Sequence, residues 1–489
     1  MTAGLENTLI ERGLKIWDNA VMENTVLKRY ASPEMLRVFS DGNRYRTWRR
    51  IWLALAQSQK ETGLAIPNEA LRQMEANVDK IDLSRVAVLE KDLRHDVMAH
   101  IHHFGELAPA AKPYIHLGAT SCDVTDNADL ILMREGLHLL ETKLKAVLYH
   151  LRAAALEHRD LPCLGYTHLQ PAQPTTMGKR FCLWLADFTN DLILIRDVAE
   201  GLPLRGLKGA TGTQASFLAL FDGDRARVKE LERAFVERLE FPSAMLITGQ
   251  TYPRKLDKEI GDRLKGIAIS AGKMSRDLRM LQAFGEAAEP FGTKQVGSSA
   301  MPFKRNPMKM ERATSLSRYL LNLLRGLEDT AAEQFLERTL DDSALRRLTL
   351  PMGFFMADAL LQLCGVTAQG LVVKMDVVAR RLKAYLPFLL VETILMEWVK
   401  KGGDRQTAHE LFRQEALKAH AEVEKGRANP LFKNLLRVEG FPLTESELKV
   451  LARPRALVGT APWQVKEFVA KAVEPLLKGF EPADFRVNV

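Results

Sequence analysis

The chain has 489 residues, of which 46% are hydrophobic and 27% are charged. This composition is typical of globular proteins and excludes a disordered or fibrous chain, and the length allows about two to four domains. The net charge of +8 favours nucleic acid, a membrane surface or a small anionic ligand as a partner. The basic residues are spread thinly, with the densest group at 44–50, so we expect no nucleic-acid partner.

Three further absences narrow the class of protein. The four cysteines form no CxxC pair, which excludes a disulfide framework and favours a reducing compartment, the cytoplasm. The amino terminus has no basic start followed by an apolar stretch, so we expect no signal peptide. The best candidate for a membrane span, 388–399, contains Glu392 and Glu397, so we expect no membrane span.

Shorter helical patterns precede about residue 120, and a long helix follows them. Residues 114–161 contain no proline, and apolar side chains recur there at alternating steps of three and four, as in a heptad pattern. These side chains are Leu130, Met133, Leu137, Leu140, Leu144, Val147, Leu151 and Ala154. The pattern predicts a helix buried in a bundle, which one chain or several subunits could build.

Prolines 162, 171 and 174 predict an extended connection between two helices. Four more proline-free stretches with helical spacing follow, at 175–202, 254–289, 308–350 and 352–386. No alternation of strands and helices is present. We therefore expect an all-α fold with a central bundle of long helices and three domains, at 1–120, 121–373 and 374–489.

Two polar segments before and at the start of the long helix contain candidate site residues. The first, 93–105, holds four histidines, but no cysteine and no HExxH spacing accompanies them, so we expect no metal site. In the second, 116–130, Thr120, Ser121 and Asp123 have the pattern of a helix start. Their hydroxyls and the free amides could also hold a carboxylate.

Two further segments lie between apolar helices. His168 lies in the proline-rich connection, where a stiff loop suits a general acid or base. Segment 206–217 has glycines at 206, 209 and 212, which match neither GxGxxG nor a Walker loop. We therefore expect no nucleotide cradle of either type there.

The most specific signal is the segment 292–312. Gly297, Ser298 and Ser299 make a flexible start, and Asn306-Pro307 has the pattern of an N-cap followed by the first helical residue. With Lys304 beside it, the amino terminus of this helix predicts an anion site with free amides. Such a site can also stabilise negative charge that develops during a reaction.

The segment 335–347 could bind phosphate. Ser343 and Arg347 are four residues apart and share a helix face, and Arg338 lies upstream. A solvated face with ion pairs to Asp341 and Asp342 explains the same pattern.

Segment 297–307, GSSAMPFKRNP, closely resembles the signature of the fumarase/aspartase superfamily, whose members eliminate fumarate from succinyl compounds. Together with HDVMAH, HLGATSCDVTDN, THLQPAQPTTMGKR, ITGQTY and RTLDDSALRR, it is similar to the adenylosuccinate lyase family over nearly the whole chain. The resemblance implies three helical domains, a homotetramer with shared active sites, and no metal or organic cofactor. It also implies cleavage of adenylosuccinate to AMP and of succinylaminoimidazole-carboxamide ribotide (SAICAR) to AICAR, each with release of fumarate.

The resemblance also implies residue roles. His168 would protonate the departing nitrogen, Ser298 would remove the proton from carbon, and Lys304 would hold a succinyl carboxylate. His95 and Glu311 would support these groups. The substrate would be bound by Arg29, Tyr30, Arg94, Asp96, His116, Thr120, Ser121, Gln250, Arg312, Arg338, Ser343 and Arg347.

Phe303 departs from the family pattern, which often has His or Tyr there, and we expect little consequence. Two rival interpretations are a sister enzyme, such as argininosuccinate lyase or fumarase, and a non-catalytic structural protein of the crystallin kind. We expect 291–305 to be a mobile lid. We also expect His168 and Ser298 to lie at opposite ends of long helices, so that different chains would supply them to one site.

Overall fold

The computed structural model describes residues 29–485, so the segment tested for a signal peptide lies outside the described residues. The expected all-α class is confirmed, because helices dominate and the strands are few and short. The amino-terminal elements are α3 (Pro33–Val38), α4 (Asp41–Glu61), α5 (Asn68–Ala76), α6 (Leu83–Leu93), α7 (Asp96–Leu107) and a 3₁₀ turn (Pro109–Ala111).

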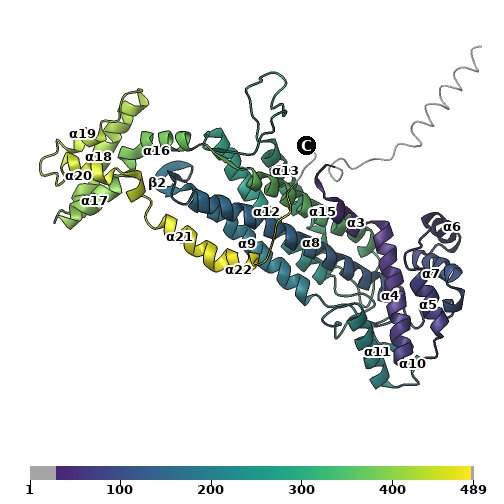
Figure 1. The fold of residues 1–489 in the computed structure, drawn as a ribbon. Coiled ribbons are helices and arrows are strands. Elements are labelled where there is room, and N and C mark those ends of the chain that lie inside the picture. Colours follow the sequence, from purple (N-terminus) through teal and green to yellow (C-terminus); the bar gives the residue numbers. More distant parts are fainter. Residues whose placement is uncertain (1–28, 486–489) are drawn as a thin grey trace, which may run out of the picture.

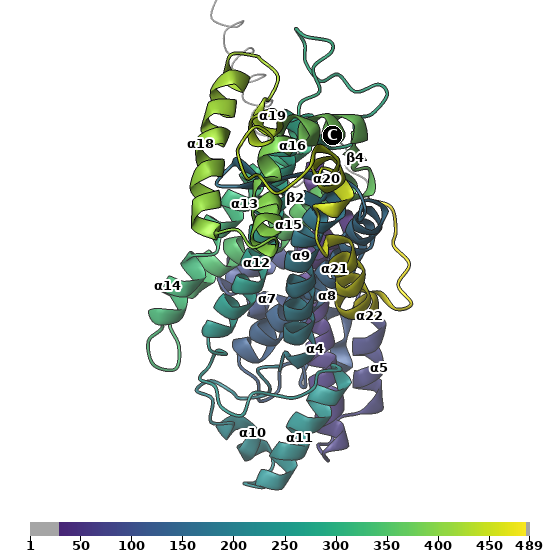
Figure 2. The same cartoon turned by 90° about the vertical axis from the view of Figure 1, so that its left-hand side faces the viewer.

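Long helices form the central bundle, in which α8, α9, α12, α13 and α15 run side by side (Figures 1 and 2). The elements of this region are α8 (Ser121–Glu157), β1 (Pro162–Thr167), β2 (Gln170–Thr176), α9 (Met177–Gly201), α10 (Ala215–Leu220), α11 (Arg225–Arg238), α12 (Lys255–Ala283), β3 (Ala287–Ala288), α13 (Met308–Leu323), α14 (Gly326–Ala332), α15 (Asp342–Gln369) and β4 (Val372–Val373).

The apolar pattern of α8 is covered by its own chain. Helix α8 begins with a capping box between Thr120 and Asp123, as the hydroxyl and acid pattern predicts. From Leu130 to Leu151 every side chain of the pattern is at most 1% exposed. Of the two alternatives for this pattern, the core of one chain is therefore correct.

The proline-rich connection is extended, as predicted, and it folds into an antiparallel hairpin of β1 and β2. Thr167 pairs with Gln170, which leaves His168 and Leu169 as a two-residue turn. Both turn residues have positive φ, 52° and 58°, as a tight primed hairpin turn requires. His168 thus lies at the tip of the hairpin, whose second strand leads into α9.

Prolines mark the helix ends less well than expected. The stretch 308–350 is not one helix, because α13 ends at Leu323 and α15 starts only at Asp342. Pro351 lies inside α15, and Pro387 lies inside α16. Burial of apolar side chains along α15 outweighs the hydrogen bond that its proline removes.

Among the described residues, α15 has the length and apolar composition of a membrane-spanning helix, and 78% of its most apolar window is buried inside the fold. This helix lies at the centre of the bundle, beside α8, α12 and α13 (Figure 1).

The carboxy-terminal region contains α16 (Met375–Leu389), α17 (Val391–Lys400), α18 (Arg405–Glu424), α19 (Leu431–Leu435), α20 (Glu445–Leu451), a 3₁₀ turn (Pro454–Ala456), α21 (Ala461–Phe468), a π turn (Val469–Val473) and α22 (Glu474–Leu477). Residues between 386 and 457 have a core of their own. Residues 465–477 share the core of the central bundle instead. The division at 120 and 373 remains a proposal.

Candidate functional site

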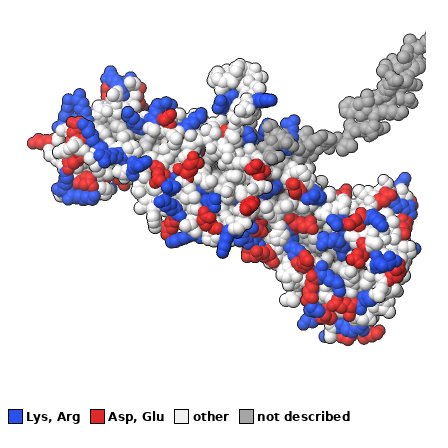
Figure 3. All heavy atoms as spheres, in the orientation of Figure 1, with Lys and Arg blue, Asp and Glu red and all other residues white. Residues whose placement is uncertain are grey.

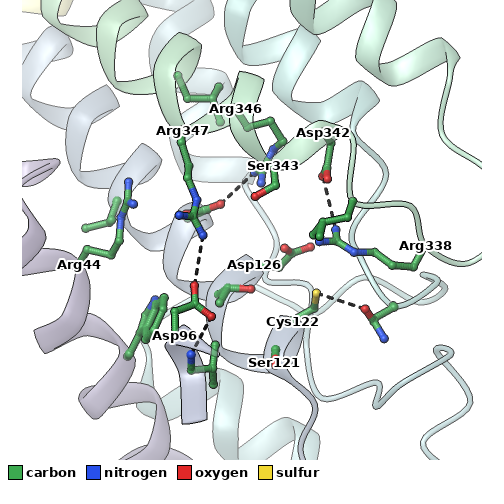
Figure 4. A pocket seen from close by; sticks show the side chains of 18 of the residues that line it. Arg44, Asp96, Ser121, Cys122, Asp126, Arg338, Asp342, Ser343, Arg346 and Arg347 are labelled. Atoms are coloured by element: carbon green, nitrogen blue, oxygen red, sulfur yellow. Dashed lines mark hydrogen bonds and ion pairs between the residues drawn. The ribbon is translucent and has the colours of Figure 1, made fainter. Parts of the chain in front are cut away.

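A cavity of about 510 Å³ opens where α7, α8 and α15 begin and where the chain enters α12. Eight of the predicted site residues line it: Arg94, His95, Asp96, Ser121, Gln250, Arg338, Ser343 and Arg347 (Figure 4). Three helices thus point their amino ends toward one place, where positive dipole ends and guanidinium groups favour an anion.

Helix α15 presents two pairs of side chains in different directions. Asp342 and Arg346 are four residues apart and almost fully buried, with 1% and 7% exposure. Ser343 follows Asp342 and Arg347 follows Arg346, and both lie in the cavity wall. The prediction that Ser343 and Arg347 share a face agrees with this arrangement. The alternative of a solvated acidic face fails for Asp342, because it is buried.

An ion pair crosses the cavity. The Nη2 atom of Arg347 lies 3.2 Å from Oδ2 of Asp96, which joins α15 to the start of α7 (Figure 4). His95 precedes Asp96 and caps α7, since its Nδ1 accepts the N–H of Met98 at 3.3 Å. In this chain His95 therefore orders the start of α7 as well as lining the cavity.

Hydrogen bonds hold Gln250 in the cavity wall. Its backbone N–H donates to the carbonyl of Glu337 at 3.0 Å, and its side-chain Nε2 donates to Ala210 at 2.9 Å. The Sγ of Cys122 lies 3.8 Å from Oε1 of Gln250. Burial raises the pKa of Cys122 to about 11, so the thiol is protonated and donates to Gln250.

His116 and Thr120 lie just outside the cavity lining. The indole N–H of Trp52 donates to Nδ1 of His116 at 3.0 Å, and burial lowers the pKa of His116 to about 4. His116 is therefore neutral with its proton on Nε2. Thr120 is the N-cap residue of α8, so its side chain serves the helix end.

His168 lies at the opposite end of the bundle from this cavity. Helix α8 runs from Ser121 to Glu157, and 37 residues at a rise of 1.5 Å span about 55 Å. The hairpin with His168 follows the far end of α8 (Figure 1). Within one chain, His168 cannot reach the residues around Ser121.

The loop with Ser298 starts at the same end of the bundle as the hairpin, which corrects the expected placement at opposite ends. Phe284, at the end of α12, stacks on Tyr166 of β1 with ring centroids 5.2 Å apart. The chain runs down α9 and returns along α12, so two long antiparallel helices bring it back to where it began. The distance along the sequence had suggested the opposite.

Ser298 lies in a turn whose amides face its hydroxyl. Its Oγ accepts the N–H groups of Ala300 at 3.3 Å and Met301 at 3.1 Å. The Nδ2 of Asn306 donates to the carbonyl of Gly297 at 2.8 Å and closes the loop at its base. Two amide donors at the hydroxyl oxygen favour its deprotonated form.

The anion site predicted at the start of α13 is wrong, because the chain fills it with its own carboxylate. Glu289 is 3% exposed and accepts the N–H groups of Lys309 at 3.2 Å and Met310 at 3.0 Å. The helix begins at Met308, after Pro307 as N-cap, one residue later than expected. Lys304 is exposed and remains available to a ligand.

Four more predicted residues lie near the start of α13 or beside it. The guanidinium of Arg312 lies 5.7 Å from the centre of the Tyr30 ring. Glu311 and Arg29 are exposed. The structure therefore divides the predicted site residues of one chain among the cavity, the hairpin tip and the region around the 291–307 loop.

Within residues 29–485, no group of three His, Cys, Asp or Glu side chains is arranged to hold a metal ion.

In the glycine-containing segment 206–217, the N–H groups of Lys208 and Gly209 donate to Asp123 at 2.8 and 3.2 Å. These amides are therefore already used within the fold.

Sequence reasoning missed several side chains that line the cavity. They are Arg44, Trp48, Cys122, Asp126, Asp129, Arg254, Asp342 and Arg346. The acidic pair Asp126 and Asp129 inside an apolar helical pattern was a signal, because a buried carboxylate needs a partner. Nothing in the sequence placed Arg44, from α4, at this cavity.

The chain matches known lyases in sequence and in structure. Residues 29–320 match the family described as Lyase. The 3-carboxy-cis,cis-muconate lactonizing enzyme of Pseudomonas putida is 26% identical with a TM-score of 0.80, and the match covers 93% of this chain and 99% of that one. A fumarate lyase of Mesorhizobium is 25% identical with a TM-score of 0.78, covering 92% and 99%. The fold and the site thus define a lyase of the fumarase/aspartase superfamily.

Closer relatives specify the branch. Residues 387–468 match the carboxy-terminal region of adenylosuccinate lyase. The adenylosuccinate lyase of Saccharomyces cerevisiae is 46% identical over 457 residues, which cover 93% of this chain and 95% of that protein. That of Schistosoma mansoni is 44% identical over 461 residues, covering 94% and 96%. The chain belongs to the adenylosuccinate lyase family and is a carbon–nitrogen lyase.

Proposed function

We propose that this enzyme cleaves adenylosuccinate to AMP and fumarate, and SAICAR to AICAR and fumarate, in purine biosynthesis in the cytoplasm. The observation that carries the proposal is the cavity with Ser121, Gln250, Ser343 and Arg347, in a chain 46% identical to a named adenylosuccinate lyase. The substrate has two carboxylates and a phosphate, and this cavity offers guanidinium groups, hydroxyls and helix amino ends to them.

In the proposed mechanism, Ser298 removes a proton from the carbon beside a succinyl carboxylate, and His168 protonates the nitrogen as the carbon–nitrogen bond breaks. A serine hydroxyl is a weak base in water, so its alkoxide needs stabilisation. The N–H groups of Ala300 and Met301 supply this stabilisation. Lys304 lies close to the succinyl carboxylate in the proposed complex and stabilises the negative charge that moves onto it when the carbon loses its proton.

The supporting roles are part of the same proposal. Glu311 orients His168 or a neighbouring charge, and His95 supports the site from the start of α7. Arg338, Ser343 and Arg347 hold the phosphate. Arg29, Tyr30 and Arg312 complete the nucleotide site from the region around the start of α13.

We also propose a homotetramer in which each site takes residues from more than one chain. About 55 Å of helix α8 separates Ser121 from the hairpin end, so one chain cannot join its own cavity to its own His168. Large apolar side chains are exposed on the bundle helices: Leu183 (49%) and Ile193 (49%) on α9, and Ile269 (61%) on α12. Such side chains are suited to contact with another copy of the chain.

The test is the change in ultraviolet absorbance after addition of adenylosuccinate, argininosuccinate or malate in separate reactions. We expect the purified enzyme to act on adenylosuccinate alone. Turnover of either of the other two compounds, with none of adenylosuccinate, would replace the proposal by a sister activity. No turnover of any of them would favour a structural protein.

A further inference from the structure

A buried ionic network forms part of the cavity wall and extends behind it. Arg254 donates through Nη1 and Nη2 to Asp126 at 3.0 and 3.2 Å, and through Nε to Asp342 at 2.6 Å. The three side chains are only 1–3% exposed. Arg254 therefore ties the start of α12 to α8 and to the first residue of α15.

A second arginine extends this network. Arg346 donates through Nε to Asp257 at 2.7 Å and pairs with Asp129 at 3.0 Å. The hydroxyl of Tyr252, which is fully buried, hydrogen-bonds both Arg346 and Asp257. The N–H of Tyr252 also donates to Asp126 at 2.9 Å, which joins the two arginines in one network.

Most members of the network line the cavity themselves, and they lie close in sequence to the side chains that we propose bind the substrate. On α15, Asp342 and Arg346 are followed directly by Ser343 and Arg347. Tyr252 and Arg254 follow Gln250 within four residues.

Two further links reach Ser121 and Arg338. Asp126 is on the α8 helix that starts at Ser121. Asp342 also accepts a hydrogen bond from Arg338 at 3.4 Å, which ties this cavity arginine to the network.

Stability alone is a poor reason for such a network at this place. Removing charged groups from water costs free energy, and apolar side chains of similar volume often stabilise a core as well or better. Ion pairs of this kind also fix geometry, because a guanidinium holds the carboxylates that it bonds in one relative position. Here the fixed directions belong to the ends of three segments, α8, α15 and the start of α12, that bound the cavity.

We propose that Arg254 and Tyr252 are positioning residues that set the nucleotide affinity of this enzyme. The nitrogen atoms of Arg254 are all hydrogen-bonded to Asp126 and Asp342, and Tyr252 is fully buried, so both act through these neighbours. They hold the amino ends of α8 and α15 and the segment of Gln250 at the separation that one phosphate-bearing ligand needs. The inference rests on the proposed function, because it assumes that the cavity holds the nucleotide.

The test compares AMP binding by calorimetry, together with KM and kcat, in the full-length oligomer. The variants are Tyr252→Phe, which removes one buried hydroxyl, and Arg254→Lys, which cannot bridge both carboxylates. Both variants displace side chains that we propose bind the phosphate, and loss of a charge-assisted contact weakens binding, so we expect AMP affinity to fall by at least roughly tenfold. KM should rise with it and kcat should change less, because neither variant alters a residue to which the proposed mechanism gives a proton transfer.

The matched control is Arg196→Met. Arg196 joins α9 to Glu141 of α8 at 3.1 Å and is not among the residues that line this cavity, so its loss should leave AMP affinity unchanged. Parental AMP affinity in both folded test variants would overturn the inference, as would an equal loss of affinity in the control. If Arg254→Lys does not form the oligomer, the AMP affinity of Tyr252→Phe alone tests the inference.

The two proposals can fail separately. AMP binding does not depend on cleavage, so a parent enzyme that binds AMP without cleaving adenylosuccinate would overturn the proposed function and still test the positioning. A parent enzyme that cleaves adenylosuccinate, with variants unchanged in AMP binding and KM, would overturn the positioning alone.

Discussion

At the scale of single residues, the hydroxyl of Ser298 is the side chain with the most demanding proposed task. Two turn amides donate to it, and the loop is closed at its base by Asn306. A neutral serine in this turn is prepared to carry negative charge before any substrate arrives. His168, its proposed partner in catalysis, lies in a tight hairpin turn. The backbone of this turn fixes the direction in which the Cα–Cβ bond of His168 points.

We predict that Ser298→Ala and His168→Gln each lower kcat by at least about a hundredfold, within the usual range for general acid–base groups. Both residues lie in turns, so circular dichroism and oligomer size should match the parent. The neighbouring Ser299→Ala is the control and should keep most of the activity. Near-parental turnover of either test variant would remove that residue from its proposed role.

We predict that Arg347→Ala weakens AMP binding by roughly tenfold to a hundredfold, since a hydrogen bond to a charged group contributes about 1.5–3 kcal/mol. Fumarate binding should change less, because the phosphate belongs to the nucleotide product. Calorimetry with each product measures both. Arg72→Ala, an exposed arginine paired with Glu69, is the control. An unchanged AMP affinity would contradict the phosphate assignment.

The sequence predicted which side chains line the cavity better than it predicted which backbone N–H groups are free to bind a ligand. Ser343 and Arg347 could be assigned to one helix face from their spacing, and both line the cavity. The spacing around Asn306 also predicted a helix start, which is there within one residue. It could not show that Glu289 occupies the amides of that helix end, because this contact joins residues about 20 positions apart.

At the scale of elements, the contact between α9 and α12 contains an unusual carboxyl group. Asp191 is 5% exposed, and its Oδ2 has no hydrogen-bond partner among the described residues. Burial raises the pKa of Asp191 from its ordinary value of 3.8 to about 7, although Ser270 donates to it. In the folded chain this acid therefore changes its charge near neutral pH, well above the range of an ordinary Asp.

The sign of the effect follows from this raised pKa. Below about pH 4, Asp191 is protonated in both the folded and the unfolded chain, so it does not change the free energy of unfolding. As pH rises toward 7, the unfolded chain loses this proton more readily than the folded chain, so Asp191 destabilises the fold increasingly. Above about pH 7 this destabilisation stays constant. Asp191→Asn should raise the free energy of unfolding at about pH 8, by up to roughly 4 kcal/mol, and the gain should fade toward pH 4. Urea unfolding at both pH values measures this, with exposed Asp197→Asn as the control. A gain independent of pH would contradict it.

The loop between α12 and α13 projects from the bundle and carries exposed apolar side chains, as the mostly white projection in Figure 3 shows. Val296 is 73% exposed, Met301 52% and Phe303 83%. We predict fast hydrogen exchange over 291–305 in the free enzyme and slower exchange with AMP and fumarate bound. Equally slow exchange in both states would contradict a lid.

At the scale of the whole molecule, the bundle separates the proposed catalytic groups instead of uniting them. The heptad pattern of α8 is no reason for assembly, because its own chain buries it. The stronger reason is the length of α8 between the cavity and the hairpin. The sequence indicated long helices, but which of their ends meet depends on antiparallel packing, which local patterns do not encode.

We predict that two inactive variants, His95→Gln and His168→Gln, regain activity when they are unfolded and refolded together. His95 lines the cavity and His168 lies at the far end of the bundle, so one site would take them from different chains. With random assortment, roughly one site in four is intact in a closed oligomer. No recovery in mixed oligomers confirmed by mass would mean that one chain supplies both.

The length of α8 also has a genetic consequence. If the two ends of this helix serve different sites, inactivating substitutions divide into two groups according to the end of the bundle at which they lie. Two alleles from different groups would complement each other in a diploid cell, and two from the same group would not. A complementation map of the gene would then trace the helix bundle from one end to the other.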